Sequence, residues 1–376
     1  MIYLDHNATT PIAPAVREAM LPYLVEKWGN PSSSYRFGAK LKGVIEVARG
    51  QVADLIGASP REIVFTSGAT EANNTALHAA LRANPARRHI VTSAVEHSSV
   101  LSCCRALECD WARVTVLPVD REGLLKLADL ENAISDDTAL VSLMWANNET
   151  GVLFPVERIA ELCRARGVLF HCDAVQAVGK LPVDLRRLPV DFLTLSAHKF
   201  HGPNGVGALF VRRGAPFTPL IHGGHQERGR RGGTENVALI VGLGVAAELA
   251  RNRVAEYAAK VRTLRDALEQ GILATISDTE LNGHPELRLP NTSNITFRGV
   301  ESEALLLLLD QAGVCASSGS ACLADSDEPS HVVRAMKPES AASRQMVRFS
   351  LGRDTTILQV DTTVRLVREA VTVLRG

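Results

Sequence analysis

The chain has no excess of charge of either sign and few aromatic side chains. Its 376 residues include 41 lysines and arginines against 41 aspartates and glutamates, and aromatic residues make up 5% of the sequence. Proteins that bind nucleic acid or anionic membranes through their overall charge carry a basic surplus, which this sequence lacks. The composition, 46% hydrophobic and 22% charged, is typical of a soluble globular protein with one large and one smaller domain.

Long apolar runs are also missing. The longest, Val237–Ala247 and Ala304–Leu309, are shorter than the roughly 20 residues that cross a bilayer. The first residues, Met1-Ile-Tyr-Leu-Asp-His6, have neither the charged nor the apolar region of a signal peptide. We therefore expect a cytoplasmic protein that does not contact a membrane.

The cysteines form neither a disulfide framework nor a zinc pattern. There are seven, an odd number, and no Cys-x-x-Cys pair occurs. This usage favours a reducing, cytosolic compartment and predicts no metal site. Most of the cysteines are expected to be small buried hydrophobic residues, which leaves one or two for chemistry.

What the sequence does contain, from residue 62 onward, is a repeated strand–turn–helix pattern. Continuous apolar runs predict strands that are covered on both faces, and the helical stretches between them imply βαβ units. The predicted strands are Glu62–Thr66, His89–Ser93, Arg113–Leu117, Ala139–Met144, Val168–His171, Asp191–Leu195 and Val206–Val211. The sequence therefore predicts an α/β fold with a mostly parallel seven-stranded sheet.

The last third of the chain predicts a smaller α+β layer. Its expected elements are the strands Ser293–Phe297 and Met346–Ser350 and the helices Glu301–Ala312 and Gln359–Leu374. Before them, the pattern predicts one helix over roughly Val237–Asn252 and a second that stops at Gly271. We expect a large domain at residues 16–252 and a small domain from residues 1–15 and 253–376.

Polar segments follow five of the predicted strands directly. They are Ser67-Gly-Ala-Thr-Glu71, Glu96-His-Ser98, Asn147-Asn-Glu-Thr-Gly151, Asp173-Ala-Val-Gln176 and Ser196-Ala-His-Lys199. In sheets of this kind ligands bind outside the carboxyl ends of the strands. Each segment alone is ordinary loop chemistry, but the five together predict one binding site.

Lys199 is the residue around which this site is expected to form. It comes just past a buried strand and before a glycine-rich turn, where burial lowers the pKa of an amine. A neutral amine can form a Schiff base with a carbonyl substrate or with pyridoxal phosphate (PLP). A lone lysine in such a place is more often a solvated loop residue, so the interpretation depends on its neighbours.

Two other segments suit PLP. Asp173 ends a predicted strand, and a buried carboxylate facing a pyridine nitrogen would keep that nitrogen protonated. Taken alone, Asp173 is as readily interpreted as a helix cap. Ser67-Gly-Ala-Thr70 precedes a helix, whose free N–H groups favour a phosphate, although serine and threonine also cap helices routinely.

Four further side chains carry weaker signals. His97 can stack on a planar ring or move protons, but a lone histidine is more often structural. Asn148 and Gln176 suit hydrogen bonds to a phenolic oxygen or a substrate carboxylate. Arg348 lies on an apolar predicted strand, where an unpaired guanidinium is costly to bury, so a carboxylate clamp would explain it.

Cys322 lies in a segment of small residues, Ala316-Ser-Ser-Gly-Ser-Ala-Cys-Leu-Ala-Asp-Ser-Asp-Glu-Pro-Ser330. Such a segment makes a poor core element, so we expect the thiol to be presented rather than packed. The nearby acidic residues would raise the thiol pKa, and activation must come from elsewhere. The alternative is an incidental surface thiol.

Together these motifs resemble the NifS/IscS-like cysteine desulfurases, fold-type-I PLP enzymes of the class V aminotransferase superfamily. The similarity covers nearly the whole chain. The stretches that carry it are Tyr3-Leu-Asp-His-Asn-Ala-Thr-Thr10, Gly29-Asn-Pro-Ser-Ser33, Phe65-Thr-Ser-Gly-Ala-Thr-Glu71, Glu96-His97, Asn147-Asn-Glu-Thr-Gly151, Asp173-Ala-Val-Gln-Ala-Val-Gly-Lys180, Ser196-Ala-His-Lys199, Arg228-Gly-Arg-Arg-Gly-Gly-Thr-Glu-Asn236, Ser317-Ser-Gly-Ser-Ala-Cys322 and Arg348-Phe-Ser-Leu-Gly-Arg353. The stretch Met144–Gly151 and the loop His222–Asn236 are most similar to the nitrogen-fixation members.

There are two departures from the family pattern. His6 stands where asparagine is usual, and the run after Cys322 is Leu-Ala-Asp-Ser-Asp where a Thr-Ser-Gly-Ser-Leu type is common. The second departure bears on the choice of partner, and it leaves the cysteine in register.

The resemblance implies how PLP is held. Lys199 would carry the cofactor through its amine, His97 would stack on the ring and take part in catalysis, and Asp173 would pair with the ring nitrogen. Gln176 would hold the phenolic oxygen. The implied phosphate ligands are Ala69, Thr70, Ser196, His198 and, from the partner subunit of a homodimer, Thr234.

The resemblance also implies the reaction. Asn148 and Arg348 would hold the carboxylate of L-cysteine, and Cys322 would accept its sulfur as a persulfide while L-alanine is released. The sulfur would pass to an iron–sulfur scaffold or another acceptor protein, in general cluster assembly or in nitrogenase maturation.

Several alternatives remain open. Selenocysteine lyase or cysteine lyase activity would differ in its dependence on Cys322, and an aminotransferase would yield a 2-oxo acid in place of alanine. An RNA-binding protein that uses Arg228-Gly-Arg-Arg-Gly-Gly233 would need salt-dependent RNA binding, and the neutral charge disfavours it. A non-catalytic scaffold would be expected to lack Lys199.

Overall fold

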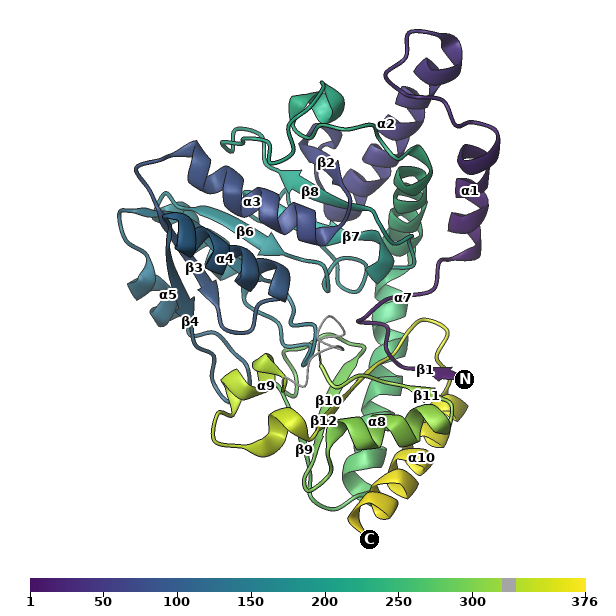
Figure 1. Ribbon diagram of the computed structural model, residues 1–376. Helices are drawn as coiled ribbons and strands as arrows, with labels where there is room; N and C mark the ends of the chain where they lie inside the picture. The colour runs from purple at the N-terminus through teal and green to yellow at the C-terminus, as the bar shows by residue number, and fades with distance from the viewer. Residues whose placement is uncertain (320–328) are drawn as a thin grey trace.

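The chain forms two lobes (Figure 1). The large lobe is built on a seven-stranded sheet, and the small lobe contains a three-stranded sheet together with the first strand and the last helix of the chain. The structure is a computed structural model that describes residues 1–319 and 329–376, so Cys322 lies outside the described residues.

The large sheet confirms the predicted α/β fold. Its strands run in the order β2-β8-β7-β6-β5-β3-β4, and β8 is antiparallel to both of its neighbours while the remaining pairs are parallel. The strands are β2 (Ile63–Thr66), β3 (His89–Ser93), β4 (Arg113–Leu117), β5 (Thr138–Met144), β6 (Leu169–Asp173), β7 (Phe192–Ser196) and β8 (Gly207–Val211). Each predicted strand is present within two residues of its expected ends.

Helices cover both faces of this sheet. One face packs against α3 (Ala69–Ala83) and α4 (Ser98–Asp110), and the other against α2 (Arg36–Ile56), α6 (Val156–Ala165) and α7 (Val237–Thr275). The central strands are buried along their whole length because both faces are covered, as their continuous apolar sequences require. The large lobe also holds α1 (Pro14–Val25), α5 (Leu127–Ala133) and the short 3₁₀ turns η1 (Pro60–Glu62), η2 (Ala197–Lys199) and η3 (Gln226–Gly229).

The small lobe has its own sheet and its own core. Strand β10 (Thr292–Phe297) lies between β9 (Thr279–Leu281) and β12 (Met346–Ser350), both antiparallel to it. Its apolar core joins Leu4 to residues between 264 and 371. The remaining elements are β1 (Ile2–Tyr3), α8 (Ser302–Gln311), β11 (Val314–Cys315), α9 (His331–Met336), η5 (Ala341–Arg344) and α10 (Ile357–Arg375).

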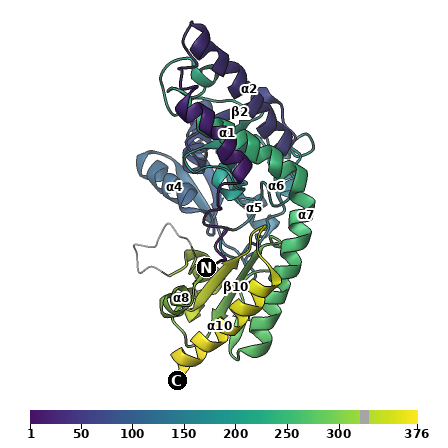
Figure 2. The same ribbon diagram turned by 90° about the vertical axis from the view of Figure 1, so that its right-hand side faces the viewer.

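The prediction of two separate helices between residues 237 and 271 is wrong. A single helix, α7, runs for 39 residues along both lobes, which Figure 2 shows along one side of the molecule. Gly271 lies inside the helix, where it packs closely against α10. A Cβ there would lie 2.9 Å from Val364 Cγ2 of α10. The glycine therefore allows α7 and α10 to approach each other.

The expected domain boundary at residues 252 and 253 falls inside this continuous helix. We retain the division into residues 16–252 and residues 1–15 with 253–376 as a proposal. It is supported by the separate apolar core of the small lobe. None of the helices in the described part of the chain is long and apolar enough to span a membrane.

The N-terminal segment joins the two lobes. Strand β1 pairs with β11 in the small lobe, and His6 N donates to the carbonyl of Ser350 on β12. A few residues later, Thr10 N donates to the carbonyl of His198, which follows β7 of the large sheet. Residues 5–10 therefore pass between the small-lobe sheet and the carboxyl ends of the large-lobe strands.

A buried ion pair anchors the glycine-rich loop at residues 219–236. Arg49 on α2 donates to both carboxylate oxygens of Glu227 at 2.6 and 2.8 Å, and both side chains are 3% exposed. The same carboxylate accepts from Phe65 N of β2 at 2.9 Å. Glu227 and Arg228 adopt positive φ angles of 48° and 58°, so this loop is held in a backbone conformation that non-glycine residues disfavour.

We expect Glu227→Ala to lower the free energy of unfolding by about 3–5 kcal/mol, because it leaves the Arg49 guanidinium buried without its carboxylate. Chemical denaturation of the two proteins measures the difference. Asp137→Ala is the matched control, since the Asp137–Arg113 pair is about half exposed and its loss should cost less than about 1 kcal/mol. Equal effects of the two substitutions would contradict this assignment.

Candidate active site

A cavity of about 430 Å³ lies where the carboxyl ends of the large-lobe strands face the N-terminal segment and β12. Its wall includes residues from all five polar segments that follow the strands, together with Asn7, Ala8 and Arg348. The structure therefore brings together nearly all the candidate residues. Those that line the cavity are Ala69, Thr70, His97, Asn148, Asp173, Gln176, Ser196, His198, Lys199 and Arg348.

Lys199 is placed by the end of β7. The strand runs to Ser196, a 3₁₀ turn covers Ala197–Lys199, and the lysine side chain is half-buried in the wall of the cavity. Its amine donates to the carbonyls of Asn7 and Ala8 at 2.6 and 2.7 Å. The N-terminal segment thus holds the amine at the wall of the cavity.

A chain of hydrogen bonds connects Asp173 to His97. Asn73 on α3 donates to Asp173 Oδ2 at 2.8 Å and to Ser99 Oγ at 2.9 Å. Ser99 Oγ lies 2.8 Å from His97 Nδ1, which also accepts from Ser99 N. Because Ser99 Oγ accepts from Asn73, its own proton is directed to Nδ1, and this places the histidine proton on Nε2. The carboxylate and the imidazole are thereby positioned as one unit.

The N-terminus of α3 faces the same cavity. Gly68 precedes the helix and makes no side-chain cap, and a Cβ at Gly68 would meet no other atom within 4 Å. No side chain caps this 15-residue helix, and Gly68, Ala69 and Thr70 line the cavity, so the helix N-terminus suits an anion there. Across the cavity, burial lowers the pKa of His198 to about 4, so its imidazole is neutral at pH 7.

Asn148 and Arg348 meet on the small-lobe side. Arg348 is 1% exposed, and it donates to the carbonyl of Asn148 at 2.9 Å and to Asp5 Oδ1 at 2.6 Å. Asp5 therefore accounts for part of the charge of this buried guanidinium, a partner that we did not predict from the sequence. Among the described residues, Arg348 Nε and Asn148 Oδ1 have no hydrogen-bond partner.

Sequence reasoning missed three residues that organise the cavity, namely Asn7, Asn73 and Lys180. The carbonyl of Asn7 accepts from Gln176 Nε2 at 2.9 Å as well as from Lys199. Lys180 is fully buried, and its amine donates to Asn7 Oδ1 and to Gln176 Oε1. Asn7 and Lys180 lie within motifs quoted above, but only their contacts distinguish them from structural residues.

Thr234 and the cysteines are placed differently from the other candidates. Thr234 is exposed and is not among the residues that line the cavity of its own chain. Four of the six described cysteines are buried, and burial raises the pKa of Cys103 to about 11 and of Cys104 and Cys163 to about 12. These three thiols are therefore protonated at pH 7.

The arginines of the glycine-rich loop make contacts within the protein. Arg228 pairs with Glu46 at 2.7 Å, Arg231 pairs with Glu71 at 2.9 Å, and Arg230 donates to backbone carbonyls. The Arg231–Glu71 pair fixes the loop beside the N-terminus of α3. These contacts disfavour the RNA-binding alternative, which needs the guanidinium groups for phosphates.

The chain matches the aminotransferase class-V family over residues 2–363. It belongs to that family. A cysteine desulfurase of Trichormus variabilis, named cysteine desulfurase 2, is 52% identical over 376 residues, covering 100% of this chain and 94% of that protein. A solved NifS-like protein superposes with a TM-score of 0.93 at 38% identity, covering 99% of both chains. A structure titled SspA in complex with cysteine has a TM-score of 0.82 at 36% identity, covering 95% of this chain and all of that one.

These similarities confirm the resemblance to NifS-like cysteine desulfurases and the fold-type-I architecture. Proteins of this kind are PLP-dependent enzymes, and PLP is the cofactor of this chain. The cavity fits that cofactor. The uncapped start of α3 offers N–H groups to a phosphate, Asp173 offers a carboxylate, and Lys199 offers an amine.

Glu96 precedes the cavity residue His97 and is fully buried. Its Oε1 accepts from Ser93 Oγ and Met144 N, and Oε2 has no partner among the described residues. Burial raises the pKa of Glu96 from 4.5 to about 8. The folded state therefore holds this proton between about pH 4.5 and 8 while the unfolded state releases it, so the free energy of unfolding falls as pH rises through this range.

We expect Glu96→Gln, which mimics the protonated carboxyl, to remove the fall in the free energy of unfolding that Glu96 causes as pH rises. Measured by chemical denaturation at a series of pH values, the free energy of unfolding of the variant should gain on that of the wild type by about 1.4 kcal/mol per pH unit between about pH 4.5 and 8. A constant difference between the two proteins across this range would show that Glu96 does not hold a proton in the folded state.

Proposed function

We propose that this protein transfers the sulfur of L-cysteine to Cys322, releasing L-alanine and leaving a persulfide on the enzyme. The observation that carries the proposal is the cavity in which Lys199, Asp173, His97 and Gln176 face the same space. The desulfurase relatives and the solved relative in complex with cysteine support the choice of substrate.

The cofactor residues would act as the resemblance implies. Lys199 would hold PLP through its amine, Asp173 would face the ring nitrogen, His97 would stack on the ring, and Gln176 would donate to the phenolic oxygen. The phosphate would be held by Ala69, Thr70, Ser196 and His198. When bound, PLP supplies an electron sink for the charge that develops on the substrate carbon.

The protein supplies the remaining chemistry. Arg348 and Asn148 would hold the substrate carboxylate, for which the unpaired Arg348 Nε is a donor. The amine of Lys199 would remove the Cα proton and later return a proton to the product. The thiolate of Cys322 would attack the substrate sulfur, so that an S–S bond forms as the C–S bond breaks. The electron pair of the broken bond stays on carbon, which is protonated to give alanine.

We infer a homodimer that completes the phosphate site. Thr234 is exposed and lies outside the cavity of its own chain, so it would act in the site of a second copy. A partner is also supported by exposed large apolar side chains at the end of α1, at the start of α2 and in the segment that joins them, which are costly to leave in water. They are Leu24, Val25, Trp28, Tyr35 and Phe37.

The finer biological setting is part of the same proposal. The persulfide on Cys322 would be delivered in the cytoplasm to an iron–sulfur scaffold or another acceptor protein. General iron–sulfur assembly and nitrogenase maturation both belong to the proposal, the second because Met144–Gly151 and His222–Asn236 are most similar to nitrogen-fixation members.

The first prediction from this function concerns Lys199. We expect Lys199→Ala, purified and supplied with PLP, to lose the visible absorption that the wild type shows, because no other amine should form the covalent link. Absorption spectroscopy after gel filtration measures it. Lys42→Ala, which removes an exposed lysine of α2, should keep the absorption. Retained absorption in Lys199→Ala would assign the cofactor to another amine.

The second prediction concerns Cys322. We expect Cys322→Ala to retain the colour of bound PLP but to lose sulfide release from L-cysteine, measured with a thiol reductant present. Cys109→Ala, which removes an exposed thiol of α4, should behave as the wild type. Sustained sulfide release by Cys322→Ala would contradict the acceptor role. Formation of a 2-oxo acid in place of alanine would indicate an aminotransferase.

A further inference from the structure

Lys180 is a buried amine that contacts Gln176 in the wall of the active-site cavity. It is less than 2% exposed, although lysine is among the residues that are least often fully buried. It lies in the turn after β6, and its Nζ donates to Gln176 Oε1 and to Asn7 Oδ1, the latter at 2.9 Å. Buried lysines usually pair with a carboxylate. In the described part of the chain Lys180 makes no such pair, so its burial needs another explanation.

The surroundings of Lys180 disfavour its charge. Burial, and next the neighbouring charges of Lys199 and Arg348, hold the pKa of Lys180 well below its usual value of 10.5. The other titratable groups that interact with it are also basic, namely His6, His198 and His201. An amine is costly in such a place, and a buried methionine would avoid that cost. What Lys180 contributes is therefore its N–H donors.

Those donors determine the orientation of one side chain, Gln176. The Gln176 amide accepts from Lys180 through Oε1, and it donates through Nε2 to the carbonyl of Asn7. In the flipped orientation, its N–H groups would face the donors of Lys180 and its oxygen would face the oxygen of Asn7. Both contacts therefore exclude the flip. Nε2 carries a second N–H, which remains available for a ligand in the cavity that Gln176 lines.

We propose that Lys180 is a positioning residue, which holds the Gln176 amide so that its nitrogen donates a hydrogen bond to the phenolic oxygen of the cofactor. Without the contact from Lys180, only the carbonyl of Asn7 opposes rotation of the amide, and the rotated amide would present its oxygen to the phenolate. This inference rests on the proposed function, since it assumes that PLP occupies the cavity.

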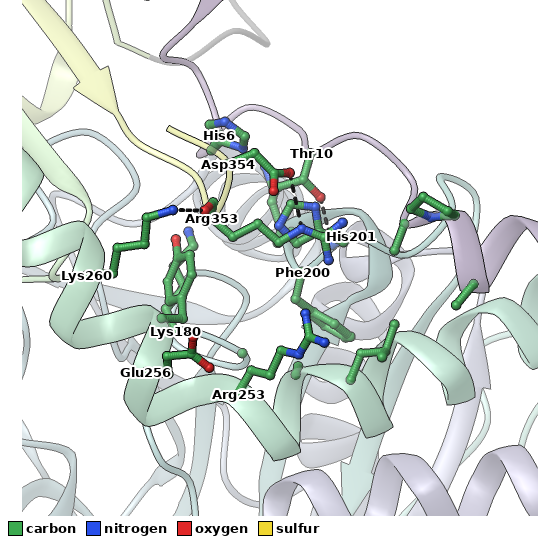
Figure 3. Close-up of a pocket in the computed structure, with 18 residues that line it drawn as sticks. His6, Thr10, Lys180, Phe200, His201, Arg253, Glu256, Lys260, Arg353 and Asp354 are labelled. Atoms are coloured by element: carbon green, nitrogen blue, oxygen red, sulfur yellow. Dashed lines mark hydrogen bonds and ion pairs between the residues drawn. The ribbon is translucent and has the colours of Figure 1, made fainter. Parts of the chain in front are cut away.

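Lys180 also lines a second cavity, of about 440 Å³ (Figure 3). It is lined by the N-terminal segment, by α7 and by the loop that carries Arg353 and Asp354. This space can take the larger guanidinium of an arginine at position 180 without displacing Gln176. Lys180→Arg is therefore a conservative variant that keeps the donors.

The test is a pH titration of the visible absorption of the PLP-loaded dimer. A hydrogen bond to the phenolate stabilises the form in which the nitrogen that joins Lys199 to PLP has lost its proton. Loss of this hydrogen bond should therefore raise the pH at the midpoint of the titration. We expect Lys180→Met to raise the midpoint by about one pH unit, the size expected for one hydrogen bond to a charged group. Lys180→Arg should titrate as the wild type.

A double-mutant cycle separates this role from a direct charge effect. If Lys180 acts through Gln176, the double variant Lys180→Met/Gln176→Leu should have the midpoint of Gln176→Leu alone. Additive shifts would mean that the charge of Lys180 acts directly, and they would overturn the proposal. Should Lys180→Met fail to fold, Lys180→Gln, whose side chain is too short to reach Gln176, replaces it in the cycle.

Lys337→Met is the matched control. Lys337 is also a buried lysine, and it donates to Glu280 and Asn282 in the small lobe, away from the cavity. Its replacement should leave the midpoint unchanged. A wild type that binds no PLP would refute the proposed function. If the wild type binds PLP but Lys180→Met has the same titration midpoint as the wild type, only the role of Lys180 is refuted.

Discussion

The active site depends on the backbone of residues 5–10, which joins the two lobes. The carbonyl of Asn7 accepts from Lys199 and from Gln176, and its side chain accepts from Lys180. The same segment binds the small-lobe sheet through Asp5 and Arg348. Asn7 also donates to the carbonyl of Asn148, so this one residue contacts Lys199, Gln176 and Asn148 together. The N-terminal segment therefore sets the geometry in which an amine, an amide and a guanidinium face one cavity.

The large sheet supplies the other half of this geometry. Parallel strands end at one edge, so five polar segments that are far apart in the sequence meet there. Hydrogen bonds then align them, as when Asn73 links Asp173 to the helix that His97 begins. The candidate residues thus form one set of coupled groups, in which removing a linking residue such as Asn73 should disturb both Asp173 and His97.

Much of this could be predicted from the sequence, because the strong signals are local. Apolar runs predicted the strands, and the polar segments after them predicted the edge at which the cavity lies. The prediction of a helix end at Gly271 was wrong, since in a sequence a glycine that allows close packing of two helices cannot be distinguished from one that ends a helix. The roles of Asn7 and Lys180 could not be predicted, because the hydrogen bond between them joins positions 173 residues apart. Asp5 was missed as the partner of Arg348 for the same reason.

The central claim is that Lys199, rather than the neighbouring buried amine of Lys180, holds the cofactor. Borohydride reduction fixes a link between PLP and a lysine permanently, so the labelled lysine can be identified by peptide mapping with mass spectrometry. We predict that reduction of the PLP-loaded wild type labels the peptide that contains Lys199 and no other. Label on Lys180, or on any lysine outside the cavity, would contradict the account.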